Sequence, residues 1–419
     1  MTATLIHNIG QLITIDSAQI IDNNPLGIIE NGALVIEDGR IAWIGSTADI
    51  NPADFAETID ARGRVVMPGL IDSHTHTIFA GDRADEFEMR LQGKTYLEIA
   101  HAGGGILKTV DATRKASEQE LYDLTRERLL RMLSLGVTTV EVKSGYGLDF
   151  ATELKCLNVL RNLQTDSPVS IVPTYMGAHD IPPEYHARTD DYVELICNAQ
   201  IPAIAQQGLA VFCDVFCEQG YFDVAQTRRI LEAASAHGLK LKVHAEEFVN
   251  LGGAELAGEM GATSADHLLN ISDAGIAALK AGGTVATLLP GTAFFLRLKE
   301  YAPVQRLLSA GVPVALGTDF NPGSCLIDDL QLIMQLACLQ MNMQPVDVIR
   351  AVTLNAAKAL DLQADRGSLA VGKRADMMIL NASSYNALFY NVGRNLVSDV
   401  FVGGRRYLRR WFEEHLAPA

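Results

Sequence analysis

Hydrophobic and polar residues alternate near both ends of the chain, and turn residues separate the runs. Residues 33–45 contain two apolar runs around an Asp-Gly pair, which predicts a β-hairpin. Short strands with glycine-rich turns are also expected within residues 367–380 and 397–408. Terminal segments this short look too small to fold alone. We therefore expect residues 1–65 and 360–419 to pair into one small β-sandwich domain.

The middle of the chain alternates short apolar runs with helix-like stretches such as residues 117–136 and 225–238. The second stretch has a start signal at Asp223 and ends at Gly238. Eight strand–helix units over roughly 250–300 residues are typical of a (β/α)8, or TIM-like, barrel. We expect this barrel to span residues 66–359. The expected strands lie within residues 65–74, 136–145, 169–179, 210–217, 239–246, 261–268, 282–290 and 312–320.

Composition limits the partners that this chain is expected to bind. Hydrophobic residues make up 48% of the sequence, enough for a large globular core. The net charge of −16 repels phosphate groups, so neither nucleic acid nor an anionic membrane is an expected partner. An anionic substrate would need a local basic pocket. Six cysteines without CxxC spacing, no signal peptide and no run of ~18 apolar residues predict a cytoplasmic protein.

Histidines stand at the expected carboxyl ends of several strands. His74 and His76 are two residues apart, so on a strand their side chains point the same way. Active sites of these barrels lie at the same end of the strands, and imidazoles aimed at one point hold Zn²⁺ or Fe²⁺. One histidine alone is more often an ordinary hydrogen-bonding residue. The joint pattern favours a metal site, because four further candidates follow the third, fifth, sixth and eighth strands: His179, His244, His267 and Asp319.

Two segments, VMPGLIDSHTH and GSLAVGKRADMMIL, resemble the metal-dependent amidohydrolase superfamily. The segments IFAGDRADEF, AGGGI, EVKSGYGLD, TYMGAHDIPPEY, HAEEF, ADHL and GTDFNPGS are similar to its imidazolonepropionase family, ring-opening hydrolases of histidine degradation. The resemblance covers nearly the whole chain. It implies hydrolysis of the cyclic amide C–N bond of 4-imidazolone-5-propanoate to N-formimidoyl-L-glutamate. It also implies a homodimer.

The resemblance also implies one divalent metal, zinc or iron, and its ligands: His74, His76, His244 and Asp319. Superfamily members with two metals often carry a bridging carboxylated lysine on the fourth strand. The corresponding stretch here, VFCDVFCEQGYF, contains no lysine. A metal with an open coordination position lowers the pKa of its water to about 7 and so supplies hydroxide at neutral pH. His267, Glu247 and Asp319 are all placed for the proton transfers, and the sequence does not choose among them.

The expected substrate carries a propionate, and Arg83 can bind a carboxylate through two nitrogens. Without the resemblance, Arg83 fits a surface salt bridge equally well, and Tyr146 fits a packing residue. Glu247 falls where the family binds the ring or directs the water, although a helix-start carboxylate is the alternative and Glu246 competes with it. The residues that match the family's substrate contacts are Arg83, Tyr146, His179, Glu247, Asn321, Gly323 and Ser324.

Three other functions are compatible with parts of this pattern. A purine or pyrimidine deaminase of the same superfamily would use the same metal ligands. A non-catalytic member would have lost ligands that are all present here. A phosphate-binding barrel would need a glycine-rich phosphate loop after the seventh or eighth strand.

Two lysines on the fifth strand, Lys240 and Lys242, share the strand parity of His244 and so point inward. A buried lysine needs a partner: either Glu141 on the second strand pairs with Lys242, or the strand register differs from the one inferred here.

Overall fold

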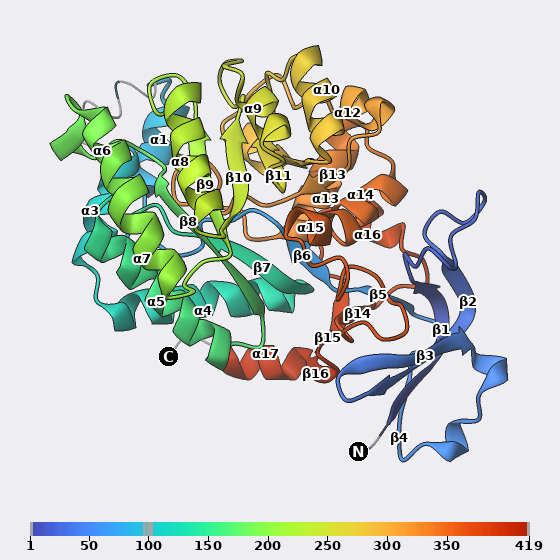
Figure 1. Ribbon diagram of the computed structural model, residues 1–419. Helices are drawn as coiled ribbons and strands as arrows, with labels where there is room; N and C mark the ends of the chain where they lie inside the picture. The colour runs from blue at the N-terminus through green and yellow to red at the C-terminus, as the bar shows by residue number, and fades with distance from the viewer. Residues whose placement is uncertain (1–2, 95–97, 99–103, 417–419) are drawn as a thin grey trace.

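The computed structural model describes residues 3–94, 98 and 104–416 (Figure 1). The chain forms two eight-stranded sheets, one mixed and one parallel. In the described part, no helix combines the length and the apolar character that crossing a bilayer requires.

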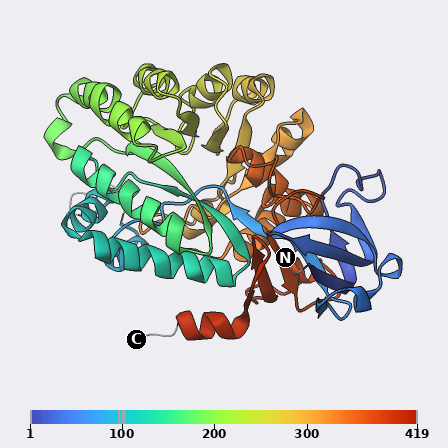
Figure 2. The ribbon, with the colours of Figure 1, turned by 60° about the horizontal axis from the view of Figure 1, so that its bottom comes forward.

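The mixed sheet joins strands from both ends of the chain, as Figures 1 and 2 show in blue and red. Its order is β16-β15-β14-β5-β1-β2-β3, and β4 pairs with β1. Its strands are β1 (Thr4–Ile13), β2 (Ile28–Glu37), β3 (Arg40–Ser46), β4 (Glu57–Asp60), β5 (Val65–Pro68), β14 (Met377–Leu380), β15 (Val397–Val402) and β16 (Arg405–Leu408).

The expected hairpin within residues 33–45 is confirmed as β2 and β3. Asp38 and Gly39 both have positive φ, 49° and 75°, as a tight hairpin turn requires. The sheet curls, and two of its distant parts meet. The backbone N–H of Ala375, just before β14, donates to the carbonyl of Gly39 in the turn between β2 and β3. The expected β-sandwich therefore takes the form of one continuous sheet curled around one apolar core. That core includes Ile6, Leu34, Ile36, Ile59, Val66, Met377, Ile379 and Phe401.

The parallel sheet is the expected (β/α)8 barrel. Its order runs from β6 to β13 with every neighbouring pair parallel. A bridge between Thr75 and Phe320 joins the segments that follow β6 and β13 and so closes the ring. The barrel strands are β6 (Leu70–Asp72), β7 (Val137–Lys143), β8 (Ser170–Ala178), β9 (Phe212–Cys217), β10 (Lys240–Ala245), β11 (Ser264–His267), β12 (Val285–Leu288) and β13 (Val314–Leu316).

The first expected barrel strand, residues 65–74, is wrong as a single strand. The structure divides it into β5 of the mixed sheet and β6 of the barrel, with Gly69 between them. Gly69 lies so close to Thr138 that a Cβ there would be 2.4 Å from Thr138 Cγ2. Both halves of the run are buried, so the hydrophobic pattern passes without a break from one sheet to the other. The domain boundaries expected at residues 65 and 360 stay a prediction.

Helices cover the outside of the barrel, and both helices expected from sequence form. Ser117 caps α4, and Asp223 forms a capping box with Gln226 at the start of α8. The α-helices are α1 (Ala84–Leu91), α3 (Ile106–Lys115), α4 (Glu118–Ser134), α5 (Phe150–Asp166), α6 (Thr189–Leu195), α7 (Ile201–Gln206), α8 (Val224–Ala236), α9 (Gly253–Glu259), α10 (Asp273–Gly282), α11 (Pro290–Phe295), α12 (Val304–Ala310), α13 (Leu330–Met341), α14 (Pro345–Ala351), α15 (Leu354–Ala359), α16 (Ala387–Tyr390) and α17 (Arg409–His415).

Helix α15 fills the end of the barrel where the strands begin. Ala356, Ala357 and Ala359 pack with apolar side chains from β6, β8, β9, β12 and β13. Small alanine side chains let the helix sit close against the strand ends. With that end filled, only the carboxyl ends of the strands are available for a site that a substrate can enter.

Asp72 connects the first and last strands at the carboxyl end of the barrel. This buried carboxylate accepts hydrogen bonds from the backbone N–H of Thr318 at 3.0 Å and from the Thr318 hydroxyl at 2.7 Å. The backbone N–H of Asp319 also donates to the carbonyl of His74 at 3.0 Å. These hydrogen bonds between the first and last strands hold His74 and Asp319 next to each other.

We expect Asp72→Ala to lower the free energy of unfolding by about 2–4 kcal/mol, because the Thr318 donors lose their acceptor in a dry environment. Thr318→Val removes only the hydroxyl and should cost about 1 kcal/mol. Urea denaturation in the presence of a chelator measures both without a contribution from bound metal. Equal midpoints for Asp72→Ala and the unmodified protein would contradict this role.

Candidate metal centre

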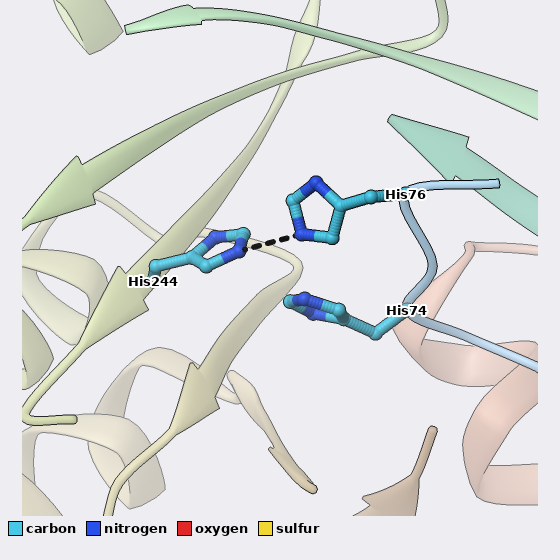
Figure 3. A group of neighbouring side chains, drawn as sticks. All are labelled: His74, His76 and His244. Carbon is cyan, nitrogen blue, oxygen red and sulfur yellow. Dashed lines mark hydrogen bonds between the residues drawn. The ribbon is translucent and has the colours of Figure 1, made fainter. Parts of the chain in front are cut away.

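Three histidines from two strands face one another at the carboxyl end of the barrel (Figure 3). His74 and His76 follow β6, and His244 lies on β10. The Nε2 atoms of His76 and His244 are 3.4 Å apart, and the ring centroids of His74 and His244 are separated by 4.5 Å. All three side chains are buried. Both His74 and His76 therefore turn their rings to one point, as the sequence predicts, although they follow β6 rather than lie on it.

Asp319 brings a carboxylate to the same point from the segment after β13. Its Oδ1 atom lies 3.4 Å from His74 Nε2 and 3.5 Å from His76 Nε2. The other oxygen, Oδ2, accepts a hydrogen bond of 2.6 Å from the Thr292 hydroxyl. The structure thus brings together all four expected ligands, although their role as ligands stays a prediction.

Two further aspartates orient two of these rings from behind. Asp266 Oδ2 lies 2.7 Å from His74 Nδ1, and Asp214 Oδ1 lies 3.0 Å from His244 Nδ1. An ionised carboxylate is only an acceptor, so each Nδ1 carries the proton. Each Nε2 then presents a lone pair toward the centre. Histidines that bind metals are usually oriented in this way.

The donor set fits a divalent cation. Among the described residues, His74 Nε2 has no hydrogen-bond partner although it is buried. Burial lowers the pKa of His74 and of His244 well below the ordinary value, so both rings are neutral, as metal ligands must be. Burial raises the pKa of Asp319 to about 7, and a cation in contact would favour its ionised form. Buried lone pairs that face one another without a donor are stabilised by a metal ion.

His267 and Glu247 lie beside this centre. His267 ends β11, and its ring centroid is 5.1 Å from that of His244 and 5.4 Å from that of His74. Its Nε2 atom lies 3.7 Å from Glu247 Oε2. Burial raises the pKa of Glu247 well above the ordinary value, and the charge of Asp319 adds to this. A pair of titratable groups next to the ligands is the arrangement that proton transfer needs, but these catalytic roles stay predictions.

The structure separates the adjacent carboxylates Glu246 and Glu247. Glu246 has positive φ, 58°, and accepts hydrogen bonds from the backbone N–H groups of Leu251, Gly252 and Ala254 at 3.0–3.2 Å. The helix-start role considered for Glu247 thus belongs to Glu246, which serves the start of α9. Glu247 faces His267 instead.

The loop after β7 places Tyr146 next to His179. The His179 ring stacks on His76, with centroids 4.8 Å apart, and its Nδ1 lies 3.0 Å from the Gly145 carbonyl. The Tyr146 ring is 5.2 Å from that of His179. The buried Glu153 side chain holds this loop by accepting from three of its backbone N–H groups. Both residues therefore lie at the centre, and their substrate contacts stay predictions.

Arg83 lies in a buried ion pair rather than a surface one. Its Nε and Nη2 atoms are both 2.8 Å from Glu86 Oε2, and both side chains are more than nine-tenths buried. Arg83 Nη1 packs directly on Gly323, where a Cβ would lie 2.1 Å from it. Gly323 is thus required for this close approach, and Arg83 lies against the loop that follows Asp319.

The Asn321 side chain builds that loop. Its Oδ1 accepts from the backbone N–H groups of Gly323 and Ser324, and its Nδ2 donates to the carbonyl of Asp319. The side-chain amide is therefore engaged within the loop. Of the three expected loop residues, Gly323 is the one that lies against Arg83.

The expected pair between Glu141 and Lys242 is wrong. Both side chains are buried, but Lys143 takes Glu141, with Nζ 2.7 Å from Oε1. Lys242 Nζ instead lies 3.7 Å from Asp266 Oδ2 and donates to the carbonyls of Ser73 and Ala359. Strand parity identifies which side chains point inward, but the stagger between strands decides which of them meet.

Lys240 and the cysteines have no part in the centre. The expectation that Lys240 points inward is wrong, because Lys240 is exposed at the start of β10 and pairs with Asp361. Cys213 and Cys217 are buried free thiols, and burial raises the pKa of both. They are structural, as the lack of partners in the sequence indicated.

Sequence reasoning missed Lys143, Asp214, Asp266 and Phe216. The three charged residues stand within short strands that are buried along their whole length, and charged residues inside such runs are a signal that was available in the sequence. Phe216 has no such signal. Its ring lies 5.8 Å from that of His244 and 6.3 Å from that of His179, and it adds an apolar wall to the centre.

Comparison with known proteins gives one family model and several relatives of nearly full length. The model of the amidohydrolase family matches residues 57–101 and 90–389. The imidazolonepropionase of Alkaliphilus metalliredigens is 46% identical over 97% of this chain and 98% of its own. That of Geobacillus kaustophilus is 50% identical, with 91% of each chain covered. That of Porphyromonas gingivalis is 47% identical, with 96% of each covered.

Solved structures share the fold at lower identity. An adenosine deaminase from Xanthomonas campestris with bound zinc has a TM-score of 0.72 and 20% identity, covering 97% of this chain and 93% of its own. A 5-methylcytosine deaminase from Klebsiella pneumoniae has a TM-score of 0.73 and 18% identity, covering 96% and 98%. These similarities support the barrel and its accompanying sheet.

We expect Glu246→Ala to lower the free energy of unfolding by about 2–4 kcal/mol, because three backbone N–H groups lose their acceptor. Glu247→Ala is the matched control. It removes a carboxyl group whose burial is itself unfavourable, so stability should change by less than about 1 kcal/mol. Denaturant midpoints measured with a chelator present separate the two. A larger loss from Glu247→Ala than from Glu246→Ala would reverse the assignment.

Proposed function

This chain belongs to the imidazolonepropionase family of amidohydrolases, and from that we propose that it hydrolyses 4-imidazolone-5-propanoate to N-formimidoyl-L-glutamate. The observation that carries the proposal is the near full-length identity of 46–50% to imidazolonepropionases. In the reaction the oxygen of water bonds to the ring carbonyl carbon, and the bond from that carbon to the ring nitrogen breaks. The nitrogen takes one hydrogen of the water.

One divalent metal, held by His74, His76, His244 and Asp319, is part of the proposal. Three imidazoles and one carboxylate suit zinc and iron alike. When bound, the ion would polarise the ring carbonyl and supply an activated water near neutral pH. Asp266 and Asp214 keep the Nε2 lone pairs of His74 and His244 directed at it.

The proton transfers divide between two sides of the centre. Asp319 has Oδ1 among the imidazole Nε2 atoms, and there it takes a proton from the attacking water. Glu247 and His267 lie together, with Oε2 and Nε2 3.7 Å apart. Burial raises the pKa of Glu247 well above the ordinary value, which keeps a proton available for the departing nitrogen.

Substrate binding uses the basic group that a protein of net charge −16 must supply locally. Arg83 Nη1, next to Gly323, binds the propionate together with the loop that carries Ser324. The rings of His179 and Tyr146 lie next to that of His76 and contact the imidazolone ring. A homodimer, a cytoplasmic location and the lack of nucleic-acid or membrane partners remain predictions.

The proposal is tested by metal analysis together with an ultraviolet assay of imidazolone propionate loss. We expect about one equivalent of zinc or iron per chain and rapid hydrolysis. His244→Ala should lose the metal and at least about 100-fold in kcat/KM. His237→Ala, at an exposed histidine outside the site, should change neither. Less than half an equivalent of metal together with no hydrolysis in the unmodified protein would favour a non-catalytic member.

Arg83→Ala should raise KM for imidazolone propionate about 10–100-fold, because a charged hydrogen bond to the propionate contributes about 1.5–3 kcal/mol. kcat should change less, since the propionate lies away from the reacting bond. Glu86→Gln in the same background removes the carboxylate that Arg83→Ala leaves buried alone. Unchanged KM in both variants would remove Arg83 from the propionate site. No hydrolysis of imidazolone propionate by the unmodified, metal-loaded protein would favour the alternative, a deaminase of a purine or pyrimidine ring.

A further inference from the structure

A buried ion network lies next to the candidate metal centre, and the proposed reaction gives no role to its central lysine. Lys143 ends β7, and its side chain is fully buried. Its Nζ atom is 2.6 Å from Asp214 Oδ2 and 2.7 Å from Glu141 Oε1. A third carboxylate oxygen, Asp266 Oδ2, lies 3.7 Å from the same Nζ. One ammonium group therefore contacts carboxylates from three other positions of the barrel wall.

Two of these carboxylates are the groups that orient the imidazoles. Asp214 uses Oδ2 for Lys143 and Oδ1 for the Nδ1 of His244. Asp266 Oδ2 lies close to Lys143 and accepts from the Nδ1 of His74. Lys143 is thus connected to two separate rings through two aspartates. Asp214 connects it to His244, and Asp266 connects it to His74.

The position of the ammonium matters because the surroundings are dry. An aspartate in the barrel interior needs a counter-charge and a fixed hydrogen-bond partner to keep one orientation. Lys143 supplies both to Asp214, whose Oδ1 also accepts from the backbone N–H of His244 at 3.2 Å. For Asp266 it shares this task with Lys242, which lies at the same 3.7 Å from Oδ2, and with the Ser264 hydroxyl, which donates to Oδ1 at 2.6 Å. Asp214 therefore depends on Lys143 more than Asp266 does.

We propose that Lys143 is a positioning residue for the metal centre, whose ammonium group fixes Asp214 and Asp266 and through them directs His244 and His74 toward a single cation. This inference rests on the metal site of the proposed function. It assigns to Lys143 no contact with substrate. Its removal changes metal affinity first and turnover only as a consequence.

The sharpest test uses the double variant Glu141→Gln with Lys143→Met, and Glu141→Gln alone as the matched control. The double variant removes one positive and one negative charge, so the net charge of the buried network is unchanged and the side-chain volumes stay similar. The control keeps Lys143 and its contacts with both aspartates. A difference between the two variants therefore reports on Lys143 alone.

The dissociation constant for Zn²⁺ is measured by competition with a chromophoric chelator, and the melting temperature of each metal-free protein is recorded alongside. We expect the double variant to bind zinc about 10–100-fold more weakly than the control, as for other losses of groups behind metal-binding histidines. In metal-free protein, the ¹⁵N signals of His74 and His244 should move from one Nδ1-protonated form toward a mixture of tautomers. Equal zinc affinity in the double variant and the control overturns the inference.

Two further results separate this inference from the proposed function. If the unmodified protein binds no zinc or iron, the proposed metal site fails, and the inference fails with it. If the unmodified protein binds one equivalent and the double variant binds it as tightly, only the inference fails. Should the double variant not fold, Asp214→Asn weakens the connection between Lys143 and His244 at the aspartate, with almost no change of side-chain volume. It should weaken zinc binding in the same way, and unchanged affinity there also overturns the role of Lys143.

Discussion

This structure depends on one constraint: lone pairs of several imidazole nitrogens face one another in a buried site. His74, His76 and His244 present Nε2 atoms to one another, with Asp319 Oδ1 beside them, and all are buried. Such a group is unfavourable unless a cation binds it. The rest of the barrel serves to hold these atoms together: Asp72 closes the ring of strands, and α15 fills its far end. Asp214 and Asp266 decide which nitrogen of each ring faces inward.

Charge is distributed unevenly in this acidic molecule, and the unevenness matches the chemistry. The single buried arginine pair, Arg83 with Glu86, lies against the loop after β13, whereas Lys143 and Lys242 lie among carboxylates inside the barrel. Burial lowers the pKa of Lys143, but Asp214 and Glu141 raise it by more, so it stays charged. The buried cations thus separate into one beside the loop after β13 and two inside the barrel.

Much of the fold and of the centre could be predicted from sequence, for identifiable reasons. Asp38-Gly39 marks a hairpin because few residue pairs adopt two positive φ angles, and His74 with His76 share a face because a strand has a period of two. The division at Gly69 could not be predicted, because both halves of the run are buried and look alike. The partners of Lys242 and Glu141 depend on the stagger between strands, which a linear pattern does not contain. Glu246 and Glu247 differ only through the positive φ at Glu246.

The division at Gly69 also has a mechanical consequence. Strand β5 lies in the interior of the mixed sheet, between β14 and β1, and only Gly69 separates it from β6, which leads within two residues to His74. Tension on the terminal sheet would be transmitted along covalent backbone to the histidines. The sheet made from both chain ends is therefore an anchor for the segment that carries His74 and His76, and trimming either end would loosen that segment from a distance.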